Sequence, residues 1–322
     1  MGRTSRKQPE PRADTLSDFA AGRQRRILLA VPQNEHFARV VVDSLAAAGW
    51  QVRLVYSWDD ALDALERLGA ALLIVDAALD AAAKLLCEAK LNPATCAVPV
   101  LALFPRGSSP LRSAELRVQA DIELSEPIDV AHFVAAATRE AERAVGAGPP
   151  QGRKVRFIFP SRQADLDRAA ELAAALLRPS GLDEEAQTSL LLAFREAAAN
   201  GIQHGNRRDP ARCIRAEYRQ EPAAVAIEVR DEGPGFDFRH YLDLASHIDA
   251  AQAARDRHQQ GGQGGLGIVM LLRCADRIEY NEKGNAVTLT KQVHRLAPSP
   301  AGAQAGPDED PEGLISQEDT EP

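Results

Sequence analysis

Three polar side chains that could do chemistry stand four residues apart in FREAAANGIQHG, residues 194–205: the carboxylate of Glu196, the amide of Asn200 and the imidazole of His204. The helical period of 3.6 residues places them along one stripe. A second stripe is apolar and is expected to face the core: Leu190, Phe194, Ala198 and Ile202. The polar stripe therefore points inward or into a cleft, although exposed positions of an ordinary amphipathic helix are an alternative for this segment alone.

A fourth candidate, Asp231, ends the alternating segment VAIEVRDEG. The apolar residues of this predicted strand share one face, and Asp231 continues that face toward the core side. A buried carboxylate needs a hydrogen-bond donor, and the exocyclic amine of a nucleotide base would serve. Gly233 and Gly235 follow and permit close approach of a ligand. A tight turn capped by the aspartate is the structural alternative.

Five glycines precede a predicted helix in GGQGGLGIVMLL: Gly261, Gly262, Gly264, Gly265 and Gly267. Free backbone amides at a helix start, with the helix dipole behind them, bind phosphate oxygens. A flexible hinge would also be rich in glycine. Together with the polar stripe, this loop indicates a nucleotide site. Magnesium between the phosphates takes oxygen ligands, and Asn200 could supply one, with water supplying the rest.

The segments EAAANGIQHG, VRDEGPGFD and GGLGIVML resemble the asparagine box and the two glycine boxes of the GHKL ATP-binding (Bergerat) superfamily, in the same order. Within it, the chain is most similar to the anti-sigma factor serine/threonine kinases, over about residues 154–293. FIFPSRQADLDRAAELAAALL resembles their opening strand and helix, and EAxxNxIxHG is their form of the asparagine box. The resemblance implies a domain that binds ATP and magnesium.

The resemblance also implies a role for each site residue. Glu196 would be the general base, Asn200 the magnesium ligand and Asp231 the partner of the adenine amine. The other implied nucleotide-binding positions are His204, Gly233, Gly235, Gly262, Gly264, Gly265, Leu266, Gly267 and Asn285. His204 equally fits a cap at the helix end. Asn285 stands near the place of a family threonine beside the adenine and could replace its hydroxyl.

The first half of the chain alternates short apolar runs with helical patterns. The runs are RILLAV, QVRLVY, ALLIVD, VPVLALF and DIEL, and each is followed by a predicted helix. Such alternation predicts a doubly wound parallel five-stranded sheet. Runs that are apolar throughout are typical of strands covered on both faces.

This alternating half resembles a response-regulator receiver, with Asp76 at the phosphoacceptor position after the third strand. Phosphoryl transfer to an aspartate needs magnesium held by an acidic pair after the first strand, where this chain has Val31 and Pro32. The hydroxyl position is Phe104 and the lysine position is Glu126. The resemblance therefore implies a pseudo-receiver that acts as a binding or dimer module, with Asp76 inactive.

The sequence divides into two predicted domains with a tail at each end. Residues 1–25 and 295–322 are expected to be disordered, because their composition cannot bury enough apolar surface. Residues 26–144 form the receiver-like domain, and the Gly- and Pro-rich stretch 145–153 is a linker. Residues 154–294 form the ATP-binding domain, a two-layer α/β sandwich with a mostly antiparallel sheet, because its strands alternate.

Composition excludes several classes of protein. No apolar run approaches the roughly 20 residues that span a bilayer, and the N-terminus is polar, so a cytoplasmic protein is predicted without membrane contact. The 4 cysteines form no CxxC pair, which argues against a zinc site or a disulfide framework. No basic patch is interleaved with aromatic residues, so nucleic-acid binding is disfavoured.

The resemblance implies that the chain transfers the γ-phosphate of ATP to a Ser or Thr of a protein. The implied partners are a STAS-type anti-anti-sigma factor, a sigma factor and a second copy of the chain. Histidine kinases share the glycine boxes but need a phosphoacceptor histidine on a long helix, and neither His36 nor His132 sits in such a motif. The alternative is a non-catalytic, ATP-gated protein that sequesters a partner; Glu196 favours the enzyme, because a binding module needs no base.

Overall fold

The computed structural model describes residues 25–33, 36–108, 113–146, 152–239 and 266–293. Apart from Arg25, the two predicted tails lie outside these residues. In the part of the chain that is described, no helix combines the length and the apolar character needed to cross a membrane.

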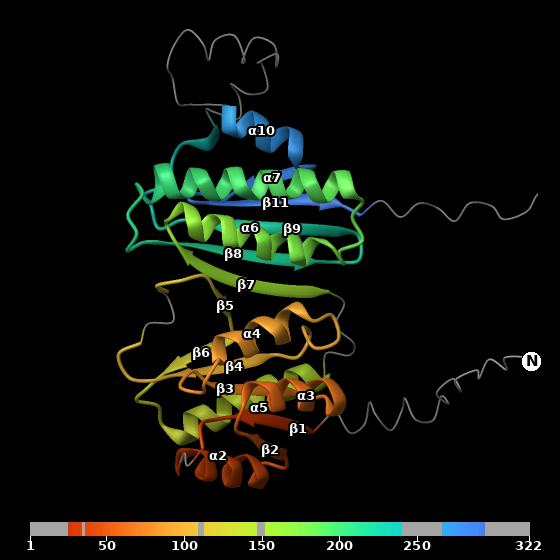
Figure 1. Cartoon of the computed structure of the whole chain (residues 1–322), viewed down its shortest axis with the longest axis vertical. Helices are drawn as coiled ribbons and strands as arrows, with labels where there is room; N and C mark the ends of the chain where they lie inside the picture. The colour runs from red at the N-terminus through yellow and green to blue at the C-terminus, as the bar shows by residue number, and fades with distance from the viewer. Residues whose placement is uncertain (1–24, 34–35, 109–112, 147–151, 240–265, 294–322) are drawn as a thin grey trace, which may run out of the picture.

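The first domain is a parallel sheet with helices on both faces (Figure 1). Its elements are β1 (Arg26–Ala30), α2 (His36–Ala47), β2 (Gln51–Val55), α3 (Trp58–Leu68), β3 (Leu72–Asp76), α4 (Ala82–Leu91), β4 (Val100–Phe104), β6 (Ile122–Ser125) and α5 (Val130–Gly146). The strand order is β2-β1-β3-β4-β6, and each neighbouring pair is parallel. The predicted five-stranded, doubly wound sheet is confirmed.

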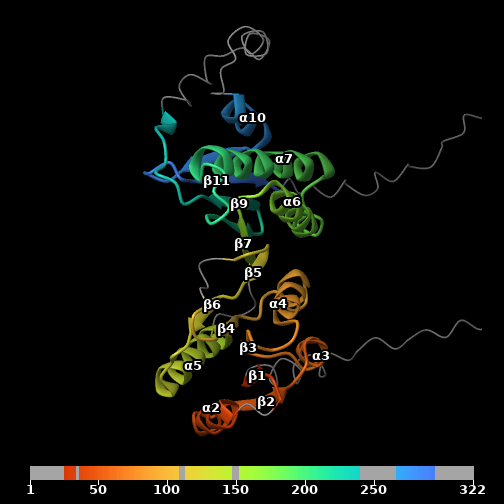
Figure 2. The ribbon, with the colours of Figure 1, turned by 60° about the vertical axis from the view of Figure 1, so that its left-hand side comes forward.

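Burial explains why these strands are apolar throughout. Leu28 packs into a core with α3 and α4, whereas its neighbours Ile27 and Leu29 pack into a second core with α2 and α5. Figure 2 shows these helix pairs on opposite sides of the sheet. Successive strand residues point to opposite faces, so a sheet covered on both faces needs apolar residues at every position.

The second domain is an antiparallel sheet with helices packed on it. Its elements are β7 (Arg153–Pro160), α6 (Gln163–Leu177), α7 (Glu184–Asn200), the π-helical turn η1 (Gly201–Gly205), β8 (Cys213–Gln220), β9 (Ala224–Arg230), α10 (Leu266–Cys274), β10 (Arg277–Tyr280) and β11 (Ala286–Gln292). The strand order is β10-β11-β9-β8-β7-β5, where β5 (Arg117–Gln119) precedes the domain in sequence, and every neighbouring pair is antiparallel. The predicted two-layer sandwich is confirmed, because the alternating strands bury one face against α6, α7 and α10.

The segment between β4 and β6 differs from its prediction. A helix was expected after VPVLALF, but the described residues of this segment contain the short strand β5 (Arg117–Gln119) and no helix. Proline has no amide hydrogen for helical hydrogen bonding, so Pro105 disfavours a helix in this segment, which explains why the prediction was wrong. β5 joins the second domain's sheet by pairing antiparallel with β7, with Val118 opposite Phe157 (Figure 1).

Side chains reinforce this junction between the two domains. The Arg156 guanidinium on β7 donates hydrogen bonds to the carbonyls of Ala120 and Asp121, at 2.7 and 2.8 Å. Arg153, also on β7, is 7% exposed and donates to the carbonyl of Lys90 at 3.0 Å. Lys90 is itself buried and forms a 2.5 Å ion pair with Asp121. The domains are therefore joined by a shared sheet and a polar interface as well as by the chain at 145–153.

We expect Val118→Asp to destabilise the second domain, although the residue precedes that domain in sequence. Val118 is 4% exposed within the core built by α6, α7 and the second sheet, so an aspartate would bury an unpaired charge. The free energy of unfolding should fall by about 3 kcal/mol or more. Urea unfolding followed by circular dichroism measures it.

Gln119→Thr is the control for this substitution, because Gln119 is partly exposed on the same strand and threonine favours strands. It should change the unfolding free energy by less than about 1 kcal/mol. Equal stabilities of Val118→Asp and the wild type would show that β5 does not pack on the second domain in solution.

Candidate nucleotide site

Helix α7 positions the polar stripe that the sequence predicted. Its start is capped, because the Asp183 carboxylate accepts a hydrogen bond from the Ala186 amide at 2.7 Å. Two glutamates in the first turn also stabilise the helix, because their negative charges interact favourably with the positive end of the helix dipole. The predicted apolar stripe is confirmed as buried, at Leu190, Phe194, Ala198 and Ile202. The stripe with Glu196 and Asn200 lies beside it and is only partly buried.

Glu196 and Asn200 lie against the first turn of α10. The Asn200 Nδ2 donates to the Glu196 Oε1 at 3.3 Å. A Cβ atom on Gly267 would lie 2.9 Å from the Asn200 Nδ2 and would overlap the Glu196 Oε1. Only glycine therefore lets α10 approach this stripe so closely, and the approach brings together the predicted base, the predicted magnesium ligand and the second glycine box.

The asparagine box ends in the π-helical turn Gly201–Gly205, where His204 is exposed. Such turns recur at functional sites. Asn206, which follows the turn, is fully buried: its Nδ2 donates to the Ser161 Oγ at 2.8 Å and to the Cys213 carbonyl at 3.0 Å. Its Oδ1 accepts from the Glu232 amide at 2.8 Å. Asn206 thus ties the asparagine box to the first glycine box.

Asn206 was not among the residues predicted from the sequence. The only signal it offered was a small amide residue directly after HG, where helix ends often place Asn. Its hydrogen bonds cross from one motif to another, so they could not be read from local spacing.

The Asp231 carboxylate lies in a pocket of glycines. Cβ atoms on Gly205 and Gly233 would each come within 2.7 Å of its oxygens, and Gly201 lies next to it on the helix side. The Oδ1 accepts a hydrogen bond from the Gly233 amide at 2.7 Å. Burial raises the pKa of Asp231 above its ordinary value, and the Gly233 hydrogen bond opposes this only in part. Additional hydrogen-bond donors would therefore stabilise the carboxylate.

Asn285 supports the backbone of Asp231. The Asn285 Nδ2 donates to the Asp231 carbonyl at 3.1 Å, and its Oδ1 accepts from the Asn281 Nδ2 at 2.9 Å. The Asp231 amide in turn donates to the Asn285 carbonyl at 3.0 Å. Both ends of the Asn285 side chain are thus used within the protein, and its place beside an adenine stays a prediction.

The first glycine box packs tightly on the hairpin between β10 and β11. Gly235 and Gly284 have φ of 82° and 75°, and a Cβ on either would overlap a backbone carbonyl, that of Lys283 or Phe236 respectively. The ring of Phe236 meets Tyr280 edge-on at 5.6 Å, and burial raises the pKa of Tyr280 to about 12. The NEKGN hairpin predicted from the sequence is confirmed, and it holds the Asp231 turn in place.

The remaining candidate positions are only partly described. Gly262, Gly264 and Gly265 lie outside the described residues, and Leu266 begins α10 without a described side chain. Helix α7 and its π-helical extension contact both glycine boxes, at Gly267 and at Asp231. The structure therefore brings the three predicted motifs to one side of the second domain.

In the first domain, the receiver-like positions occupy the carboxyl ends of strands. Asp76 ends β3, and its Oδ1 accepts a hydrogen bond from the Ala78 amide at 2.8 Å. Val31 follows β1 and is buried. Phe104 ends β4, where the Arg117 guanidinium stacks over its ring at 5.1 Å. The residue at the hydroxyl position thus contacts the strand that joins the domains.

We expect Asp76 to accept no phosphoryl group from acetyl phosphate and magnesium. Val31 and Pro32 offer no carboxylate for a metal, and Phe104 and Glu126 offer neither hydroxyl nor ammonium to the phosphoryl oxygens. Intact-mass measurement of the full chain should show no added phosphoryl mass. A stable adduct that Asp76→Asn removes would contradict the pseudo-receiver interpretation.

Comparison with known proteins assigns the class of the second domain. Residues 159–291 match the family model of the histidine kinase-like ATPase domain. This range begins in β7 and ends in β11, so it contains every described motif residue of the site. The second domain is a histidine kinase-like ATPase domain. No curated protein matches the chain.

Several solved receiver domains are similar to the first domain. A CheY-like response regulator receiver domain protein from Methanospirillum hungatei JF-1 is 17% identical, with 38% of this chain and 98% of that chain covered and a TM-score of 0.32. The receiver domain of a signal transduction histidine kinase from Syntrophus aciditrophicus is 19% identical, with 36% and 89% covered and a TM-score of 0.32. The chemotaxis response regulator CheY4 of Vibrio cholerae is 16% identical, with 36% and 98% covered and a TM-score of 0.32.

Proposed function

We propose that the second domain binds ATP with magnesium and transfers the γ-phosphate to a Ser or Thr hydroxyl of a partner protein. The observation that carries the proposal is the position of Glu196. Its carboxylate is partly exposed, one helical turn from Asn200 and in contact with the first turn of α10. A carboxylate at this place can accept a proton beside the phosphates that a helix start binds.

The residues present fit the nucleotide. A Cβ on Gly205 or Gly233 would overlap the Asp231 carboxylate, so glycine at these positions leaves room for it, and burial raises its pKa. A donor such as the adenine amine would offset the cost of burying this charge. The Asn200 Nδ2 faces Glu196, which directs its Oδ1 away from that carboxylate. An amide oxygen is a ligand that magnesium accepts, and magnesium, when bound, would offset charge on the phosphates.

The proposed reaction is a single transfer. The acceptor hydroxyl oxygen forms a bond to the γ-phosphorus while the bond from that phosphorus to the ADP oxygen breaks. The hydroxyl proton passes to Glu196. Backbone amides at the start of α10 stabilise negative charge on the transferred group. General-base assistance of this kind contributes about 10²–10⁴-fold to the rate.

We propose a STAS-type anti-anti-sigma factor as the acceptor and a sigma factor as a second partner, by resemblance to the anti-sigma factor kinases. An ATPase domain of the histidine kinase-like class joined to a receiver-like domain supports a role in signalling. A homodimer would need a surface other than the outer edge of β7 at Arg156–Ile158, because β5 occupies it.

One observation favours a second candidate, a non-catalytic ATP-gated binding protein. The hydrogen bond between Asn200 and Glu196 joins residues four apart on one helix, and such pairs also stabilise helices without any catalytic role. In that case Glu196 would support the helix or the metal site rather than take a proton.

The experiment that tests the proposed function starts from the native host. The tagged full chain is used to recover partners with and without ATP, and each recovered protein is incubated with the chain and labelled ATP. Phosphoserine or phosphothreonine on a recovered protein supports the kinase. Partners that are retained or released with ATP but never phosphorylated would support the ATP-gated binding protein.

A further inference from the structure

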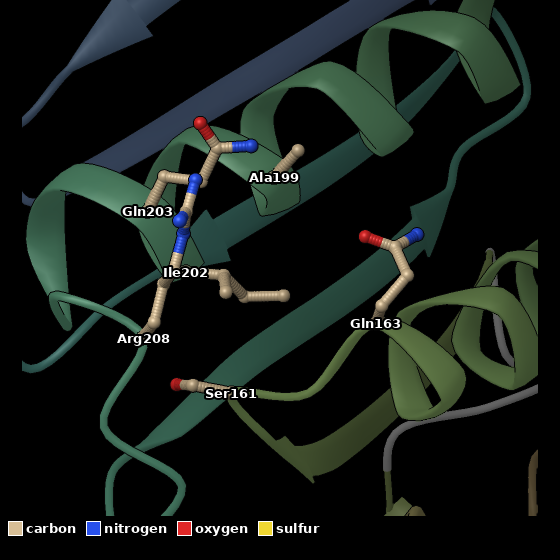
Figure 3. A pocket seen from close by; sticks show the side chains of 6 residues that line it. All are labelled: Ser161, Gln163, Ala199, Ile202, Gln203 and Arg208. Atoms are coloured by element: carbon tan, nitrogen blue, oxygen red, sulfur yellow. The ribbon is translucent and has the colours of Figure 1, made fainter.

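A cavity of about 230 Å³ opens between the start of α6 and the end of α7. Figure 3 shows Ser161 and Gln163 on one side of it and Ala199, Ile202, Gln203 and Arg208 on the other. None of Glu196, Asn200 and Asp231 lines it. The cavity is therefore separate from the candidate nucleotide site, although its lining includes the helix that carries that site.

The lining of this cavity is rich in hydrogen-bond donors. The side-chain amide of Gln203 and the guanidinium of Arg208 carry donors, whereas the Gln163 Nε2 donates to the Asp167 Oδ1 at 3.5 Å. No carboxylate of the described residues lines the cavity. The Ser161 hydroxyl is occupied, because it donates to the Arg212 carbonyl at 2.9 Å and accepts from Asn206. Ile202 and Ala199 supply an apolar wall. A cavity with these groups suits a small ligand that carries negatively charged oxygen atoms, such as a carboxylate or a phosphate.

Nearby acidic residues do not neutralise Arg208. Two carboxylates on α6 and one in the loop between η1 and β8 are each paired with another arginine: Asp165 with Arg162 at 2.9 Å, Asp167 with Arg195 at 2.6 Å and Asp209 with Arg212 at 3.6 Å. Among the described residues, the guanidinium of Arg208 forms neither an ion pair nor a hydrogen bond. Its charge therefore remains uncompensated within this part of the protein.

The backbone holds Arg208 at the cavity in an unusual conformation. Arg207 and Arg208 both have φ of 57°, a backbone conformation that residues other than glycine rarely adopt. The Arg208 amide donates to the Ile202 carbonyl at 2.7 Å, which fixes the loop against the end of the asparagine box. Arg207 shares the conformation and the exposure but does not line the cavity.

We infer that this cavity binds a carboxylate or phosphate group carried by a side chain of a partner protein. Its volume suits one acidic or phosphorylated side chain and is below the range of sites for drug-sized ligands, about 300–1,000 Å³. Arg208 supplies the charge, and Gln203 supplies a neutral donor. The inference rests on the proposed function for the identity of the partner as a protein, whereas anion binding itself requires no phosphotransfer.

The test uses inorganic phosphate and acetate as probes of the two oxyanion sources, with the full chain saturated with Mg-ADP. Nuclear magnetic resonance follows the side-chain amides of Gln163 and Gln203 during each titration. Arg208→Gly is compared with Arg207→Gly. Both glycines accept φ of 57°, so both variants should fold and even lose strain. Arg208→Gly should weaken binding about tenfold or more, and Arg207→Gly should leave it within about twofold.

The outcomes separate this inference from the proposed function. Stronger binding of phosphate supports a phosphorylated side chain, and stronger binding of acetate supports an acidic one. Equal losses of anion affinity in Arg207→Gly and Arg208→Gly would indicate that anions bind to a diffuse basic surface, and would overturn the inference. Absence of shifts at Gln163 and Gln203 with either probe would also overturn it. Failure of the chain to bind ADP would contradict the proposed function, while the anion titrations would still decide on the cavity.

Discussion

Asp231→Asn is expected to remove most of the affinity for ATP while leaving the nucleotide-free protein at least as stable at pH 7. An adenine amine donates a hydrogen bond, and the outward Nδ2 of the asparagine would present a second donor in place of an acceptor. The asparagine Oδ1 can still accept from the Gly233 amide. The variant loses a hydrogen bond to a charged acceptor and places two donors opposite each other. ATP binding should therefore weaken by about 10- to 100-fold or more. Isothermal titration calorimetry measures the affinity.

The expected stability follows from the raised pKa of Asp231, which burial causes. Folding disfavours the ionised carboxylate, so at pH 7 the charge lowers the free energy of unfolding, and asparagine removes that penalty. As the pH falls through the raised folded pKa toward the ordinary carboxyl value of 3.8, Asp231 of the wild type becomes protonated and the penalty disappears. The stability gain of Asp231→Asn should therefore be full above the folded pKa and lost below 3.8.

Glu232→Gln is the matched control, because it removes the neighbouring carboxylate without touching the glycine pocket. It should leave ATP affinity within about threefold, as expected for loss of a weak, partly exposed ion pair. Unchanged affinity in Asp231→Asn would mean that the adenine binds elsewhere. A lower thermal midpoint of Asp231→Asn at pH 7 would show that the Gly233 hydrogen bond outweighs the cost of burial.

The sequence predicted the two sheets because their signals are local. Leu72–Val75 is apolar at each position, and the structure buries it on both faces of the first sheet. The alternation of Val225, Ile227 and Val229 likewise matched a strand buried on one face. Each pattern extends over several residues of one element, so it can be recognised without knowing which other elements pack against that strand.

The strand β5 could not be predicted in the same way. It has only 3 residues, and the structure pairs them with residues about 40 positions later, such as Phe157 with Val118. No local periodicity encodes such a pairing, and the assumption of a regular strand–helix alternation favoured a helix instead. Pro105 and Pro110 were the available signals against that helix.

In the candidate site, too, local features could be predicted from the sequence, whereas contacts between distant elements could not. The four-residue spacing of Glu196 and Asn200 was enough to place them together on α7. Spacing did not show that Gly267 lies against this pair, or that Asn206 links the two motifs. Those contacts join elements far apart in the chain, and they depend on how closely the backbones approach.

One of the altered receiver positions, Phe104, contributes to the junction between the two domains. Phe104 stands where the receiver resemblance places a hydroxyl, and the Arg117 guanidinium covers its ring. Arg117 also pairs with Glu123 on β6 at 2.5 Å and belongs to β5, which extends the sheet of the ATPase domain. An aromatic residue here contributes to the contact between domains, which supports a binding role for the first domain over a phosphorylated switch.

Glu196→Gln is expected to reduce phosphotransfer by about 10²–10⁴-fold with little change in ATP affinity. Glutamine has the same shape and can still accept the hydrogen bond from the Asn200 Nδ2, so the packing of α7 on α10 should persist. It cannot take a proton from an acceptor hydroxyl at neutral pH. The transfer rate to a recovered partner and the calorimetric affinity for ATP are measured on the same preparation.

Glu185→Gln is the control for the loss of a carboxylate from α7, because Glu185 is exposed in the first turn of the helix, far along it from Asn200. It should leave both transfer and affinity nearly unchanged. If transfer and affinity fall together in Glu196→Gln, the carboxylate supports the helix or the metal rather than the chemistry. If the wild type binds ATP and its partner but phosphorylates nothing, the carboxylate is structural and the ATP-gated binding protein explains the site.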